Sequence, residues 1–211
     1  MGRTKAIGLF TLFILMVFSL PAAAAPRGVP RVRHSLKSLR LDRPPGMEEL
    51  MAAGQLGGQL HPTKEVKQDK DGLAQNLEFG QAIEQWNRHE YKKGVKLFRE
   101  YLRKHPDSPW AAEAMLHVGC DAHYNGRYDE ANQMFTTIIE QNKDKEYTGA
   151  KELVAKAKMR LGLLRVVQNN SDEAKRIFAD LKSTGADWRQ RTYAAHWLQR
   201  IRLHESDRRA E

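Results

Sequence analysis

The sequence has a single cysteine, Cys120, among 211 residues, and one thiol excludes an intramolecular disulfide. It has almost no alternation of Val, Ile and Thr with polar residues, so β-strands are not expected. It also lacks a glycine-rich phosphate loop, a Gly-x-Ser-x-Gly nucleophile motif and the paired carboxylates of acid–base catalysis. These absences favour a helical chain that is stabilised by packing and is not an enzyme.

The helical part of the sequence has little excess of positive charge, which a nucleic-acid-binding surface would need. The formal net charge is +9, but basic and acidic residues nearly balance from residue 77 onward. The densest basic excess lies in residues 26–45. A basic composition distributed in this way is a poor indication of nucleic-acid binding. We therefore expect no nucleic-acid partner.

The longest hydrophobic run, residues 6–20, is shorter than the ~20 residues that a membrane-spanning helix needs. Arg3 and Lys5 precede the run, and small residues follow it up to position 25. This is the pattern of a secretory signal peptide, so we expect residues 1–25 to be removed by cleavage after Ala24 or Ala25. No lipid-acceptor cysteine follows. The protein is predicted to be exported, either periplasmic or secreted, with an uncleaved anchor as the alternative.

Residues 26–76 are predicted to form a basic, largely disordered arm, because prolines and glycines interrupt any regular apolar period. A short helix at 46–53 is the exception, and it is too short to be stable alone in water. The basic residues of the arm could bind an anionic envelope surface, although such arms are more often simply solvated. These residues are Arg27, Arg31, Arg33, Lys37, Arg40 and Arg43.

From residue 77 to 204, apolar residues recur at helical spacing. A small residue followed four positions later by phenylalanine occurs three times, and another small residue lies at a fixed distance upstream of each pair. We expect helix pairs that cross closely at these small residues. The three sets are Ala82 with Gly94/Phe98, Gly119 with Ala131/Phe135, and Gly162 with Ala174/Phe178.

Turn and capping signals divide this region into helices. Gly126 and the Asn169-Asn170 pair tolerate positive φ and would end helices. Ser108 with Pro109 is typical of an N-cap and first helical position. Residues 187–190 are typical of a capping box that starts a last helix, which ends near residue 204 and leaves 205–211 as a tail. The sequence thus predicts an all-α fold of about seven helices.

The order of a small-residue helix, the turn at Gly126-Arg127-Tyr128 and the pair Ala131/Phe135 is the signature of a tetratricopeptide (TPR) repeat. Residues 77–204 therefore resemble the TPR superfamily, with about three repeats and a capping helix in a hairpin solenoid. The run from Tyr101 to Ala114 is also similar to exported bacterial TPR proteins, namely the Tol-Pal coordinator and outer-membrane assembly lipoprotein families. Shared architecture and compartment are implied, without direct equivalence.

TPR domains bind partners along the surface formed by the first helix of each repeat, and the resemblance implies the same here. For Trp86, a role in the groove and a role in the core remain open. The implied partner-binding positions are Phe79, Ile83, Trp86, Asn87, Glu113, Leu116, His117, Cys120, His123, Tyr124, Lys156, Met159, Arg160 and Leu163.

Two more specific readings of this surface are weaker. Lys156 and Arg160 match half of the basic clamp by which some TPR adaptors hold a peptide carboxylate, but Phe79 and Ile83 replace the other half. The set His117, Cys120 and His123 fans over ~120° of a helix and climbs ~9 Å, so it cannot face one tetrahedral ion. No metal, cofactor or catalytic residue is predicted.

The sequence therefore predicts a non-enzymatic, mostly monomeric exported adaptor that binds a protein or peptide in a groove. The alternative is an export and docking module of a larger secreted enzyme or YD-repeat protein whose catalytic region is absent from this chain.

Overall fold

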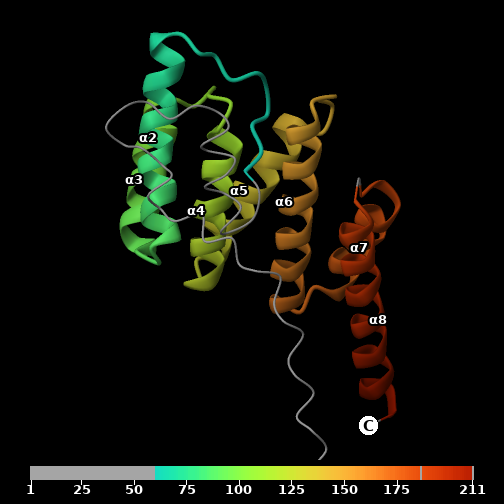
Figure 1. Cartoon of the computed structure of the whole chain (residues 1–211). Coiled ribbons are helices and arrows are strands. Elements are labelled where there is room, and N and C mark those ends of the chain that lie inside the picture. The colour runs from blue at the N-terminus through green and yellow to red at the C-terminus, as the bar shows by residue number, and fades with distance from the viewer. Residues whose placement is uncertain (1–59, 186, 211) are drawn as a thin grey trace, which may run out of the picture. The chain divides into compact units, whose positions relative to one another are not determined.

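The structure is a computed structural model that describes residues 60–185 and 187–210. The expected signal peptide 1–25, the expected helix 46–53 and the basic residues between Arg27 and Arg43 lie outside the described residues. Within them, the chain forms seven helices and no strand (Figure 1). The helices are α2 (Lys70–Asn87), α3 (Tyr91–Lys104), α4 (Ala111–Tyr124), α5 (Tyr128–Asn142), α6 (Thr148–Val167), α7 (Ser171–Thr184) and α8 (Trp188–Ala210).

Consecutive helices pack against one another as hairpins: α2 with α3, α4 with α5, and α6 with α7, while α8 covers α7. Helix α4 also contacts α6, and α6 contacts α8. The Trp86 ring of α2 meets the His117 ring of α4 with centroids 4.6 Å apart. Helices α2, α4, α6 and α8 therefore form one row, called here the inner row. The predicted all-α hairpin solenoid is confirmed.

The three hairpin turns share one backbone conformation. His89, Gly126 and Asn169 have φ values of 64°, 74° and 57°. In each turn the residue after this one donates its N–H to a carbonyl of the preceding helix, as Arg127 does to Ala122 at 2.8 Å. Positive φ is confirmed at Gly126 and at Asn169, the first residue of the Asn pair, whereas Asn170 has φ −92° and acts as the N-cap of α7; His89 carries no glycine or asparagine signal. The three hairpins therefore repeat a backbone conformation as well as a residue pattern.

The second and third hairpins close where a glycine of the first helix meets a phenylalanine of the second, whereas in the first hairpin Gly94 of α3 approaches the α2 backbone at Ala82 and Trp86. A Cβ added to Gly119 would lie 2.6 Å from Cε1 of Phe135, and one added to Gly162 would lie 2.6 Å from Cζ of Phe178. These separations are far below a carbon–carbon contact distance. The phenylalanines therefore occupy the space that a side chain would need, as the small-residue pattern predicted.

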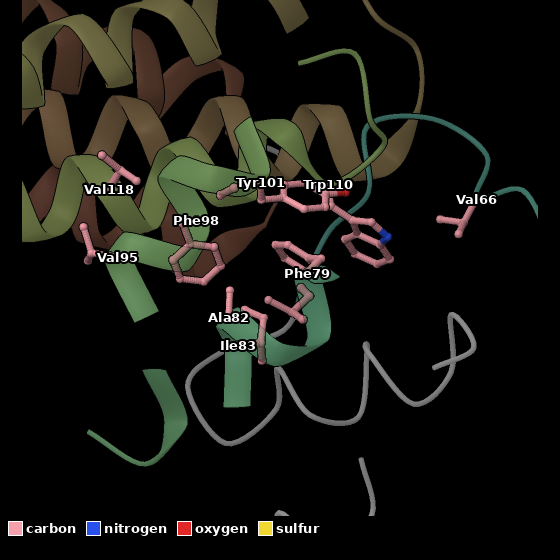
Figure 2. Close-up of a cluster of buried hydrophobic side chains, with 11 residues drawn as sticks. Val66, Phe79, Ala82, Ile83, Val95, Phe98, Tyr101, Trp110 and Val118 are labelled. Carbon is pink, nitrogen blue, oxygen red and sulfur yellow. The ribbon is translucent and has the colours of Figure 1, made fainter. Parts of the chain in front are cut away.

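Three hydrophobic clusters lie along the stack, each built mainly from neighbouring hairpins. The first joins α2 and α3 to the start of α4 and is rich in aromatic rings. Figure 2 shows Phe79 beside Trp110, and their rings are stacked with centroids 5.1 Å apart. The other clusters centre on Phe135 and Phe178. Stability thus comes from contacts between neighbouring units, as in repeat proteins generally.

Trp110 fixes the start of α4 in a way that differs from the expected cap. The helix begins at Ala111 with Trp110 at its N-cap, and Ser108 lies in the preceding turn. The Ser108 hydroxyl pairs with the Tyr101 hydroxyl and accepts the Trp110 N–H at 3.0 Å. The buried Trp110 indole donates to Asn76 Oδ1 at 2.8 Å. Ser108 therefore holds the turn rather than capping the helix.

The helical region is longer at both ends than the expected 77–204. Helix α2 begins at Lys70, because the Asp69 carboxylate caps it by accepting the Gly72 N–H at 2.8 Å. Helix α8 continues to Ala210, through most of the expected tail. Its start follows the expected capping box, since Asp187 accepts the Arg189 N–H at 2.8 Å and donates its own N–H to Gln190 at 3.4 Å.

We predict that Gly119→Val lowers the free energy of unfolding by about 1–3 kcal/mol, because the added methyl groups overlap the Phe135 ring. Thr136→Val, at an exposed position on α5, introduces the same side chain without this overlap and is the matched control. Urea denaturation followed by circular dichroism measures both. Equal midpoints for the two variants would contradict the close crossing.

Candidate partner-binding groove

The inner row carries a groove of about 320 Å³. We call it the inner groove, and its walls come from four helices and one non-helical residue. Helix α2 contributes Ile83, Trp86 and Asn87; α4 contributes Glu113, Leu116, His117 and Cys120; α6 contributes Lys156, Met159 and Arg160; α8 contributes Tyr193; and Leu60 precedes the helices. Helices from every stacked unit therefore converge on one cleft.

Most of the predicted positions line this groove, and the others fall into two groups. His123 and Tyr124 line an adjoining hollow of about 750 Å³ that shares Trp86, Cys120 and Arg160 with the groove. Phe79 and Leu163 lie elsewhere.

Phe79 does not line the groove, because its side chain is fully buried against Phe98, Tyr101 and Trp110. Aromatic side chains of α3 and of the residue before α4 cover the face of α2 that carries Phe79. Leu163 packs against the third hydrophobic cluster, around Phe178. Both residues have helical spacing compatible with a groove, and tertiary packing assigns them to the core.

Leu60 and Tyr193 were not expected to line the groove. Leu60 lay in the segment predicted to be disordered, and no helical period marks it. Tyr193 lies on α8, which was interpreted only as a cap. The position of α8 in the sequence could have indicated Tyr193, because the helix after the third hairpin continues the inner row.

A buried carboxylate lies at the floor of the inner groove. Glu113 is 2 % exposed, and burial raises the pKa of its carboxyl, against the opposing effects of Lys156 and of the His61 backbone. Its Oε1 is 3.6 Å from Nζ of Lys156, and its Oε2 accepts the His61 N–H at 3.2 Å. A buried acid is stable only with such partners, so Glu113 joins α4 to α6 and to the segment before α2.

His117 is held between rings one turn further along α4. Its imidazole stacks on Phe98 with centroids 4.7 Å apart and meets the edge of Trp86. Burial lowers its pKa to about 3, with further lowering by Lys156 and Arg160. The ring is therefore neutral, and its Nε2, 4.0 Å from Glu113 Oε1, has no hydrogen-bond partner among the described residues.

Cys120 follows His117 on α4 and lies on the wall shared by the groove and the hollow. Burial raises the pKa of its thiol, an effect that the nearby Arg160 opposes. A reactive cysteine requires the opposite shift, toward the thiolate. His117, Cys120 and His123 succeed one another along α4, and the described residues contain no group of three or more potential ligands gathered around one point.

The adjoining hollow, called here the aromatic hollow, is more exposed than the groove. It is lined by Trp86, Tyr91, Lys92, Cys120, Asp121, His123, Tyr124, Asn125 and Arg160. Tyr124 is 91 % exposed, although it is a large aromatic side chain. Asp121 pairs with Arg127 at 2.5 Å, whereas neither Lys92 nor Arg160 forms an ion pair with a described carboxylate. The hollow thus offers ring faces beside two cations.

Trp86 lies between the two spaces and resolves the choice between groove and core. Its side chain is half-buried and packs against Tyr91, Phe98 and His117. It also lines both the inner groove and the aromatic hollow. Trp86 therefore lines both spaces and also packs against core residues, which makes it a poor position for separating an effect on binding from an effect on stability.

Comparisons of the chain with protein-family models, with curated proteins and with solved structures found no match. Among the described residues, no helix combines the length and the hydrophobicity that crossing a membrane requires.

We predict that the protein loses stability as the pH falls from about 6.5 toward 4. His61 and His117 have pKa values lowered to about 4 and about 3, so the unfolded chain takes up protons in this interval that the folded chain does not. Glu113 acts in the opposite direction, because its raised pKa favours proton uptake by the folded state. His117→Gln should reduce the loss.

Urea denaturation at about pH 7 and about pH 4.5 measures this effect as a difference in unfolding free energy. His204→Gln removes a histidine whose side chain is exposed, and it should leave the difference unchanged. An identical pH dependence in His117→Gln and the parent protein would contradict the buried, neutral assignment of His117.

Proposed function

We propose that this protein is an exported, non-enzymatic adaptor that binds a stretch of a partner polypeptide along its inner row. The aromatic hollow carries this proposal, because it holds the exposed Tyr124 and the half-buried Trp86 beside two cations, Lys92 and Arg160, that lack carboxylate partners in the described residues. Tyrosine, tryptophan and arginine are the residue types enriched at the positions that contribute most to binding in protein interfaces.

The chemistry of the hollow favours an acidic peptide that also carries apolar or aromatic side chains. Rings such as Tyr124 bury a large area at little entropic cost when a partner side chain stacks on them. Arg160 can form charge-assisted hydrogen bonds to a carboxylate, and Lys92 adds a second positive charge. The partner would then gain its affinity from aromatic anchors and its orientation from charge.

The groups that line the groove support binding rather than catalysis. His117 is buried and neutral, and the Cys120 thiol has a raised pKa. A nucleophile with its activating base would need the opposite: a lowered thiol pKa and a basic imidazole within reach.

Kinship with TPR proteins is part of the proposal. Three helix hairpins whose turns share a left-handed residue conformation, two of them with the same glycine–phenylalanine crossing, support it. The intervals between hairpins are longer than the ~34 residues of a strict repeat, so the kinship is to the superfamily in the broad sense. Export to the cell envelope or the medium is supported by the sequence of residues 1–25.

We predict that Tyr124→Ala reduces partner capture at least roughly fivefold, the loss expected when an anchor worth more than 1 kcal/mol is removed. Stability should not change, because Tyr124 is almost fully exposed. A photo-crosslinking residue at position 124, in protein produced by its own cells, first identifies the partner. Binding of the purified partner is then measured by calorimetry.

Trp188→Ala is the matched control, because Trp188 is also exposed but does not line the hollow. It should bind the partner as the parent protein does. Crosslinks that form equally at positions 124 and 188, or unchanged affinity in Tyr124→Ala, would contradict the proposal. Arg160→Glu should also weaken binding, since it reverses one of the two charges.

We predict that the secreted or periplasmic protein begins at residue 25 or 26. Intact-mass measurement of protein recovered from outside the cytoplasm tests the expected cleavage after Ala24 or Ala25. Replacing both Arg3 and Lys5 by Glu should impair export, because signal peptides need a positive start. Full-length protein that stays with the cytoplasmic fraction would contradict export.

A further inference from the structure

An extended segment of the chain lies against the inner row before the first described helix begins. Residues 60–66 adopt no helical structure, yet Leu60, Pro62, Thr63 and Val66 are all buried. The segment makes its polar contacts with α4 and with the turn before it, and it packs against the start of α6. A stretch without regular structure is normally exposed at the surface, so this burial needs a specific cause.

Leu60 is the apolar anchor of the segment. Its side chain is 2 % exposed and belongs to the first hydrophobic cluster. It also lines the inner groove beside Ile83 and Leu116. Complete burial of a leucine side chain is among the larger apolar contributions that a single residue makes, so Leu60 is suited to act as an anchor.

The backbone of the segment is recognised as well. The His61 N–H donates to Oε2 of Glu113 at 3.2 Å, and the Thr63 N–H donates to the Pro109 carbonyl at 2.9 Å. The Thr63 hydroxyl donates to the same carbonyl at 3.3 Å. Alternate backbone groups of an extended chain thus have partners on one side, which is how grooves hold extended peptides.

The segment approaches α6 most closely at Gly149, near the start of that helix. A Cβ at this position would overlap the Pro62 carbonyl oxygen. Any larger residue would push the segment away from α6. The acceptor surface is therefore shaped on three sides: an acid on α4, a bare backbone on α6 and an apolar pocket between α2 and α4.

We propose that residues 60–63 are an intramolecular ligand, an extended peptide of the type Leu-x-Pro-Thr that is bound across the inner row with Leu60 at the wall of the inner groove. The chain itself thus covers part of the inner row, and an external partner is left with the surface that remains open, the aromatic hollow above all. A tethered ligand has an effective concentration on the order of millimolar, so a free peptide of the same sequence competes poorly for the site. The inference stands whether or not an external partner is found.

The segment is tested first in the full chain by hydrogen exchange with mass spectrometry. Residues 60–66 should be protected in the parent protein. In Leu60→Asp this protection should be lost while helices α2 to α8 keep theirs, as expected when a bound peptide leaves an intact receptor. Leu203→Asp is the matched control, because Leu203 is an exposed leucine, and it should leave the segment protected.

Two outcomes of the exchange experiment would overturn the proposal. Unprotected amides at 60–66 in the parent protein would mean that the segment is not bound. Loss of protection throughout α2 to α8 in Leu60→Asp would mean that the segment is an inseparable part of the core rather than a ligand. Neither outcome depends on the crosslinking at Tyr124.

The vacated groove is then tested with a labelled synthetic peptide that has the sequence of residues 57–66. Fluorescence anisotropy should show binding to the double variant Leu60→Asp/Thr63→Ala that is at least roughly tenfold tighter than binding to the parent protein. Adding Gly149→Leu to the double variant should abolish the gain. Equal affinity for the parent and the double variant would overturn the proposal.

Discussion

The close crossing of helices within each hairpin is the constraint on which the rest of the structure depends. Gly119 and Gly162 have no side chain, and the rings of Phe135 and Phe178 lie where that side chain would be. This contact brings the two helices of a unit together, so that the next hairpin finds a continuous apolar face to cover. The inner row follows, since the first helices of successive units then lie side by side.

The inner groove contains a buried carboxylate, although each helix hairpin has its own hydrophobic core. Glu113 is buried, but it lies where α4 meets α6 and the extended segment, so each of its oxygens has a partner. Lys156 and Arg160 both disfavour protonation of His117. Removing Lys156 would leave the buried Glu113 carboxylate without its cation, which is costly. We therefore regard this cluster as the point at which the fold and the groove are least separable.

The sequence predicted the helices well because their signals are local. The left-handed residues Gly126 and Asn169 and the capping box at Asp187 all follow from nearby residue types. Positive φ at His89 was not predicted, because histidine adopts this conformation far less often than glycine does and nothing local marks the position. For the groove, the inner face of α4 and α6 was predictable from the repeat pattern.

Two features of the site depended on contacts between distant residues. Phe79 has the spacing of a groove residue, but Trp110, far away in the sequence, stacks on it and places it in the core. Leu60 lies among glycines and polar residues, and only the pocket between α2 and α4 explains its burial. Periodicity describes which side of a helix is apolar; it carries no information on which distant segment covers that side.

Leu60 also determines how the protein responds to mechanical load. If the residues that precede it are tethered to a surface, tension enters the folded region through Leu60 and the amide of His61. The first bonds to bear that load are those to Glu113 and Pro109, across the row of helices, rather than the ends of α2. A pull from this side therefore unzips the extended segment one contact at a time before it strains any helix.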